Sequence, residues 1–192
     1  LNQNYSIIRL VDKNSTKLKI SNKKYTEFDI SNPLNQKSQF YLINKSKGFM
    51  GTSSGPVSIA SLFDVPILET NVYGQRVNAF TNNGSYTLKK VKKKGEILTY
   101  DELIKLNFYR GIYYSRQKLL EEGYSIINNT TEEIFKAAEH FDFLLTNPKY
   151  EPTLEQKNFK KFLPEYMELK FTKSNIDPNF INLKKKLFQN LI

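Results

Sequence analysis

The chain has 192 residues, of which 39% are hydrophobic and 14% aromatic, so it can bury a core and does not have the composition of a disordered protein. It has no cysteine and one histidine, His140, which excludes disulfides, zinc–thiolate sites, cysteine nucleophiles and histidine-rich metal cages. The net charge of +10 favours anionic partners such as phosphorylated ligands, anionic lipid or nucleic acid, and the alternative is a solvated lysine-rich surface.

The first part of the chain predicts strands and a helix in alternation. Residues 5–11 form a short run rich in β-branched side chains, and residues 25–30 alternate between apolar and polar, so both predict strands. Residues 34–46 carry apolar side chains at near-helical spacing and predict a helix. A third strand is expected at 48–51.

A turn of small residues follows the third strand. It reads Thr-Ser-Ser-Gly-Pro at 52–56, and Pro56 suits a first helical position, where its missing N–H costs nothing. A helix is expected over 57–63 and a strand over 67–70. The order strand, helix, strand, turn, helix, strand predicts a parallel, doubly wound α/β sheet.

The middle of the chain predicts loops and short helices. Residues 71–100 have the composition of loops and include a lysine run at 89–94. Thr99 and Glu102 predict the capping box of a short helix. A further short helix is expected at 115–122.

A strand at 124–127 leads into the longest predicted helix, 131–145. Thr130 and Glu133 predict a second capping box. The side chains expected to face the core from this helix are those of Ile134, Phe135, Ala138, Phe141 and Leu145.

The composition shifts toward Lys, Asn, Phe and Pro after residue 147. We therefore expect a domain at 1–147 and a helical C-terminal extension at 148–192, which ends in an amphipathic helix over 180–191. The apolar side chains of that helix are expected to contact another domain, and the alternative is an interfacial membrane helix. Because the chain begins with Leu1 and not with Met, we expect a fragment of a longer protein.

The turn at 52–56 is the strongest candidate for a ligand site. Ligands of an open parallel sheet bind beyond the carboxyl ends of its strands, where this turn is expected. Gly55 allows close backbone approach, Ser53 and Ser54 offer hydroxyls, and the helix dipole adds about half a positive charge. Such a turn suits a phosphate or diphosphate, and the alternative is a serine-rich cap on an ordinary helix. Its spacing is that of neither a P-loop nor G-x-G-x-x-G.

Residues 49–68 resemble the phosphate-binding segment of GT-B glycosyltransferases. Heptosyltransferase-like enzymes show a similar order: an apolar strand, a small turn ending in Ser/Thr-Gly-Pro/Leu, an alanine-containing helix, then x-Pro and an apolar strand. A bacterial family of surface-polysaccharide glycosyltransferases is similar over roughly residues 5–147, through Ile8-Arg9, Tyr41-Leu42-Ile43 and Asn71, and more weakly over Asn158–Leu187. The resemblance implies a Rossmann-like doubly wound sheet, which is the donor-binding half of a GT-B fold.

The resemblance also implies a role for each matching residue. Arg9 would pair with a phosphate, and the alternative is a surface arginine. Asn71 would bind sugar or ribose hydroxyls or else cap a loop, and Glu69 would accept ribose hydroxyls or else support the structure. Ser53 stands where heptosyltransferases often carry an acidic residue, which leaves the donor sugar open. The residues that would hold the donor diphosphate are Thr52, Ser53, Ser54, Gly55 and Pro56.

The implied activity is transfer of a hexosyl- or heptosyl-type sugar from a nucleotide-sugar to a surface-glycan or lipid-linked acceptor. The sequence has no Asp-x-Asp motif, so we expect a metal-independent reaction, and the nucleotide-sugar is a substrate, so no cofactor is expected. The catalytic base is expected in an N-terminal GT-B domain, while His140 is expected to be structural. The expected location is cytoplasmic, with peripheral contact at the inner face of the membrane, because no apolar run approaches the roughly 20 residues that span a bilayer.

Two other classes of protein stay open. A non-catalytic nucleic-acid- or anion-binding α/β module would explain the charge and the many aromatic residues. The chain has no ribonucleoprotein, KH or zinc motif, however, so nucleic acid is the less favoured partner. An interaction domain that keeps only the fold is the other class. The lysine run at 89–94 would attract an anionic donor or a lipid phosphate, or is a solvated loop.

Overall fold

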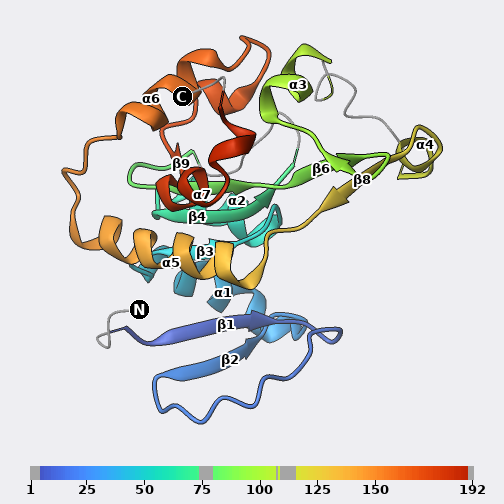
Figure 1. Cartoon of the computed structure of the whole chain (residues 1–192). Helices are drawn as coiled ribbons and strands as arrows, with labels where there is room; N and C mark the ends of the chain where they lie inside the picture. The colour runs from blue at the N-terminus through green and yellow to red at the C-terminus, as the bar shows by residue number, and fades with distance from the viewer. Residues whose placement is uncertain (1–4, 74–79, 107, 109–115, 190–192) are drawn as a thin grey trace. The chain divides into compact units, whose positions relative to one another are not determined.

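The computed structural model describes residues 5–73, 80–106, 108 and 116–189, shown as ribbon in Figure 1. The chain divides into two compact units, Leu1–Ser46 and Lys47–Ile192. This division does not coincide with the one expected after residue 147. Residues 148–189 instead belong to the same unit as the strand and turn at 49–56.

The first unit contains two strands that pair with each other in parallel. They are β1 (Ile7–Val11) and β2 (Tyr25–Asp29), followed by the 3-10 turn η1 (Pro33–Asn35) and helix α1 (Gln36–Lys45). The two strands and the helix were expected from the sequence, but the strands do not join the central sheet, as the doubly wound prediction had required. A short β-branched run specifies an extended backbone, whereas its strand partner depends on contacts distant in sequence.

The second unit is of mixed α/β class. It is built on a parallel sheet of four strands in the order β3-β4-β5-β9. These strands are Phe49–Gly51, Ile67–Val72, Ser85–Leu88 and Asn175–Ile176. The parallel arrangement of β3 and β4 confirms the expectation for 48–51 and 67–70. The last two strands were not expected, and β9 comes from the segment that was expected to be a helical extension.

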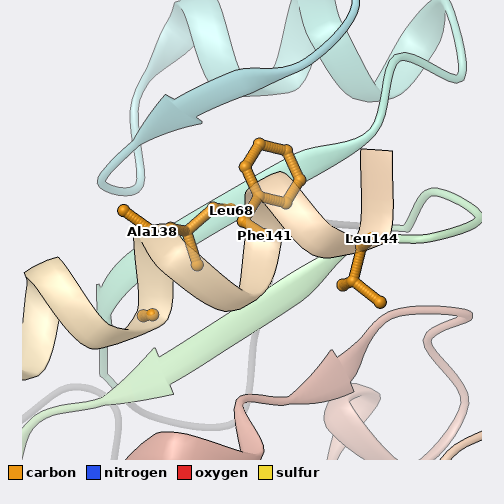
Figure 2. Packing of buried hydrophobic residues seen from close by; sticks show 5 residues of the cluster. Leu68, Ala138, Phe141 and Leu144 are labelled. Atoms are coloured by element: carbon orange, nitrogen blue, oxygen red, sulfur yellow. The ribbon is translucent and has the colours of Figure 1, made fainter. Parts of the chain in front are cut away.

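Both faces of β4 are covered. Its residues 67–70 are all buried, and successive side chains of a strand point to opposite faces of the sheet. Helix α5 (Thr131–Thr146) covers one face, where Leu68 contacts Ala138 and Phe141, as Figure 2 shows. Full burial of a leucine or phenylalanine side chain contributes about 1.5–3 kcal/mol.

The buried face of α5 differs from the expected one. Ala137 and Leu144 are buried beside Ala138 and Phe141, whereas Phe135, expected in the core, is 55% exposed. The helix therefore turns by about one residue from the predicted orientation. The spacing of apolar residues predicts an apolar stripe along the helix, but packing against the sheet decides which side chains of that stripe are buried.

A separate antiparallel sheet has the order β7-β6-β8. Its strands are Glu96–Ile97, Lys90–Lys93 and Tyr124–Ile127. The strand expected at 124–127 is confirmed, but the lysine run is a strand and not the expected loop. The nearby helices are α3 (Tyr100–Lys105), which begins with the predicted capping box of Thr99 and Glu102, and α4 (Arg116–Glu121).

The C-terminal segment packs into its own unit. Its elements are α6 (Leu154–Phe162), η3 (Glu168–Lys170), β9, α7 (Pro178–Leu183) and η4 (Lys185–Leu187). The helix expected over 180–191 is thus shorter, and its last two positions lie outside the described residues. Phe180, Ile181 and Phe188 are buried inside the unit, so they do not form the exposed apolar face that was expected to contact another domain or a membrane.

Candidate functional site

The turn at 52–56 follows the carboxyl end of β3 and opens helix α2 (Gly55–Leu62). Thr52, Ser53, Ser54 and Gly55 are exposed, and Pro56 is half-buried. Because β3 runs parallel to β4, the turn lies at the carboxyl edge of the central sheet. This is the place where ligands of parallel sheets bind.

The first turn of α2 has no side-chain cap. Ser54 occupies the N-cap position with an extended backbone, and its hydroxyl makes no capping hydrogen bond. The first regular bond runs from the Ser58 N–H to the Ser54 carbonyl, at 3.2 Å. The N–H groups of Gly55 and Val57 therefore have no acceptor within the helix. A Cβ added at Gly55 would meet no atom within 4 Å, so the backbone here is open on that side.

Ser53 and Glu69 are brought together by the pairing of β3 with β4. Glu69 lies opposite Gly51 in the parallel register and is fully buried. The Ser53 hydroxyl donates to Glu69 Oε1 at 2.7 Å. The hydroxyl proton of Ser53 is thus directed at the carboxyl group, and its oxygen can only accept from a ligand. Hydrogen bonds to a phosphate at this turn must therefore be donated by the backbone N–H groups and by the hydroxyls of Thr52 and Ser54.

Asn71 is held in a network of hydrogen bonds with Asn129. Its backbone has a left-handed φ of 57°, which an asparagine tolerates better than most residues. The Asn71 N–H donates to Asn129 Oδ1 at 2.8 Å, and the Asn129 N–H donates to Asn71 Oδ1 at 2.6 Å. The side-chain oxygen of Asn71 is therefore engaged by the protein, which matches the loop-capping alternative for this residue.

A buried charged cluster surrounds the start of α5. Glu133 is 1% exposed and accepts two bonds of 2.7 Å from Lys90 Nζ and one ion pair of 2.7 Å from Lys184 Nζ. Burial alone would raise the pKa of Glu133, but the bonds from Lys184, Lys90 and the Thr130 N–H hold that pKa below its ordinary value of 4.5. The sequence indicated Glu133 only as a capping residue, and the burial of Lys90 had no local signal.

Arg9 lies in the first unit and is used there. Its guanidinium donates to Glu27 Oε1 at 2.8 Å and to the Thr16 carbonyl at 2.7 Å. Glu27 also accepts from the Tyr25 hydroxyl at 2.8 Å, and this bond, together with the one from Arg9, holds the pKa of Glu27 below its ordinary range. Arg9 belongs to a different unit from the turn, and its guanidinium is engaged by Glu27 and the Thr16 carbonyl of its own unit.

Across residues 5–73, 80–106, 108 and 116–189, no group of three or more acidic or histidine side chains is arranged to hold a metal ion. In the same ranges, no helix combines the length and the apolar character needed to cross a membrane. Comparison of the chain with protein-family models, curated proteins and solved structures finds no match in any of the three.

Proposed function

We propose that this chain is the donor-binding domain of a metal-independent glycosyltransferase, and that the turn at 52–56 holds the diphosphate of a nucleotide-sugar. One observation carries the proposal: α2 begins without a cap, exposed, at the carboxyl edge of a parallel sheet. A diphosphate there would accept from the N–H group of Gly55, which is exposed, whereas Val57 is fully buried. The helix dipole, with about half a positive charge at this end, would favour its negative charge.

The side chains of the turn divide between two tasks in this proposal. Thr52 and Ser54 have exposed hydroxyls that can donate to phosphate oxygens. Ser53 donates to Glu69 instead, so its oxygen would accept a hydrogen bond from a sugar or ribose hydroxyl. Glu69 thereby acts through Ser53 and sets the direction of its hydroxyl. The Glu69 carboxylate, from the next strand, would then lie near the position where the resembled enzymes often carry an acidic residue.

The finer fold assignment is part of the same proposal. Coverage of both faces of β4 supports a Rossmann-like, doubly wound sheet of the kind that forms half of a GT-B enzyme. The acceptor would be a surface glycan or a lipid-linked glycan. The base that deprotonates it would come from an N-terminal partner domain, and the enzyme would work in the cytoplasm, with peripheral contact at the membrane.

Calorimetric titration with nucleoside diphosphates and nucleotide-sugars tests the proposal. We expect binding in the micromolar to millimolar range, and we expect Gly55→Leu to abolish it, because the new side chain would occupy the open space beside the turn. Ser58→Leu is the matched control, since Ser58 is exposed on the same helix one turn later, and it should bind as the wild type does.

Two results would overturn the proposal. One is a folded wild-type protein that binds no nucleoside diphosphate or nucleotide-sugar. The other is a Gly55→Leu variant that binds these compounds as tightly as the Ser58→Leu control.

A further inference from the structure

A pocket of about 310 Å³ lies where β5 and β9 begin. Gly84, Ser85 and Asn175 line it from the amino-terminal edge of the central sheet. The turn at 52–56 follows the opposite, carboxyl edge, because all strands of this sheet are parallel. The pocket is therefore separate from the proposed donor site. Its volume is at the lower end of the range for ligand pockets, which suits one small molecule.

The wall of the pocket contains an imidazole that the fold has oriented. His140, on α5, is 9% exposed, and its Nδ1 lies 2.9 Å from Oδ2 of the fully buried Asp177. Asp177 is fixed in turn by the Phe180 N–H, which donates to Oδ1 at 2.8 Å. Because the Asp177 carboxylate accepts, Nδ1 carries a hydrogen, and in the neutral form of the ring Nε2 is an acceptor.

The second ring nitrogen of His140 is unsatisfied. Nε2 is buried and has no hydrogen-bond partner among the residues that the structure describes. A buried acceptor without a partner is unfavourable, and native proteins rarely leave one. His140 is one of the residues that line the pocket, and a ligand that reaches this nitrogen with a hydrogen-bond donor would satisfy it.

The rest of the lining suits a neutral molecule with several hydroxyls. Asn82, Asn83 and Asn175 line the pocket and carry carboxamides, which can both donate and accept. The Asn82 amide also donates to Asp64 Oδ2 at 3.2 Å. The Tyr150 ring stands nearly perpendicular to the His140 ring, with centroids 5.4 Å apart, and offers an apolar surface.

The Tyr150 ring is held in place by hydrogen bonds through Gln156. Its hydroxyl donates to Gln156 Oε1 at 2.9 Å, and Gln156, which is 2% exposed, donates to the Ile176 carbonyl at 2.6 Å. The ring is therefore a fixed wall, as a preorganised binding surface requires.

The charges near the pocket disfavour an ionic ligand. Lys173 lines it as an exposed cation that repels a second cation, and its attraction for an anion is weak because solvent screens it. Asp177 lies directly behind His140, and an anion against Nε2 would meet a lone pair in front of that carboxyl group. A neutral hydroxyl meets neither penalty.

We propose that this pocket binds a neutral polyhydroxylated molecule of monosaccharide size, which donates a hydroxyl to His140 Nε2 while the asparagine carboxamides bind its other hydroxyls. His140 is the orienting acceptor of the site, and Asp177 positions it. The site does not depend on the diphosphate turn or on the proposed glycosyl transfer.

Titration of the isotope-labelled chain with glucose, galactose and N-acetylglucosamine, followed by NMR, tests this site. We expect at least one sugar to shift the backbone amides of Gly84, Ser85 and Asn175 and the ring signals of His140, with a Kd of roughly millimolar size. His140→Asn keeps a donor near Asp177 but removes the Nε2 acceptor, and it should weaken binding about tenfold.

Two further variants complete the test. Asn82→Ala changes an exposed lining residue, so it should fold even if His140→Asn does not, and it should weaken binding by about threefold. Asn182→Ala changes an exposed carboxamide that does not line the pocket, and its affinity should equal that of the wild type.

Three outcomes would overturn the proposal. The first is the absence of these shifts with all three sugars at about 100 mM, far above a millimolar Kd. The second is unchanged affinity in the folded His140→Asn variant or, if that variant does not fold, in Asn82→Ala. The third is tighter binding of the anionic sugar glucuronate than of glucose at the same residues.

Discussion

Helices α2 and α5 each begin in a turn that follows a strand, but their first turns are built differently. In α5, Thr130 and Glu133 form a capping box. In α2, the equivalent positions hold Ser54, which makes no capping bond, and Val57, whose side chain cannot complete a box. One start is closed by the protein's own polar groups and the other is open to solvent.

The difference shows what the open start lacks. Both helices present N–H groups and the positive end of a dipole. In α5 the carboxylate of Glu133 meets that charge, and Lys90 and Lys184 hold the carboxylate in place. In α2 the first turn has no acidic residue and Ser54 makes no capping bond, which is why we assign that role to a bound diphosphate.

The largest expected effect comes from removing the internal anion of α5. Glu133→Gln keeps a side chain that can form the capping box but leaves the buried ammonium of Lys90, 5% exposed, without its carboxylate. We expect the free energy of unfolding to fall by about 3–5 kcal/mol, measured by urea denaturation at neutral pH. Lys90→Met in the Glu133→Gln background should recover part of the loss. A loss below about 1 kcal/mol would show that the cluster is unimportant.

Acidification should remove part of the same stabilisation. The pKa of Glu133 is lower in the folded protein than its ordinary value of 4.5, so its contribution is present above that value and is lost as the pH falls through and below it. The difference in unfolding free energy between wild type and Glu133→Gln should therefore shrink between pH 7 and roughly pH 3. Paired urea titrations measure it, and a difference that stays constant with pH would contradict the assignment.

Asn129 comes directly before the cap of α5, and its replacement should have an intermediate effect. It is 8% exposed, accepts from Thr87 Oγ1 at 2.7 Å and donates to the Leu88 carbonyl at 2.9 Å, besides its bonds to Asn71. Asn129→Ala leaves these buried groups without partners and should cost about 1–3 kcal/mol. The matched control is Asn182→Ala, an exposed asparagine whose loss should change the unfolding free energy by less than about 0.5 kcal/mol. Equal midpoints in urea for the two variants would refute the role of this network.

The smallest expected change in stability is the most informative for function. Ser54→Asp places a carboxylate at the open start of α2 and should raise the unfolding free energy by about 0.3–1 kcal/mol through the helix dipole. The same carboxylate should repel a diphosphate and abolish nucleotide binding in calorimetry. Ser54→Asn, which can cap without charge, is the control for the stability effect. A Ser54→Asp variant that still binds nucleoside diphosphates would break the comparison between the two helices.

Some features could be predicted because they depend on neighbours in the chain. The capping boxes at Thr99 and Thr130 follow from residues three positions apart, and the structure confirms both. The strand, turn and helix over 49–62 were likewise predicted from small residues, one proline and apolar spacing. The sequence therefore predicted where the turn of the candidate site lies in the chain.

Other features required residues that lie far apart in the chain to meet. The register of β3 and β4 sets Ser53 against Glu69, and the folding of the C-terminal segment brings Asp177 to His140. The lysine run gave no sign that Lys90 would be buried, because its burial depends on Glu133, 43 residues away. Local sequence determined the starts of α3 and α5 and the strand, turn and helix over 49–62, since capping and backbone preference act over a few residues. Only the tertiary structure decided strand partners, the buried ion cluster and the oriented imidazole, because long-range packing and desolvation determine which polar groups meet.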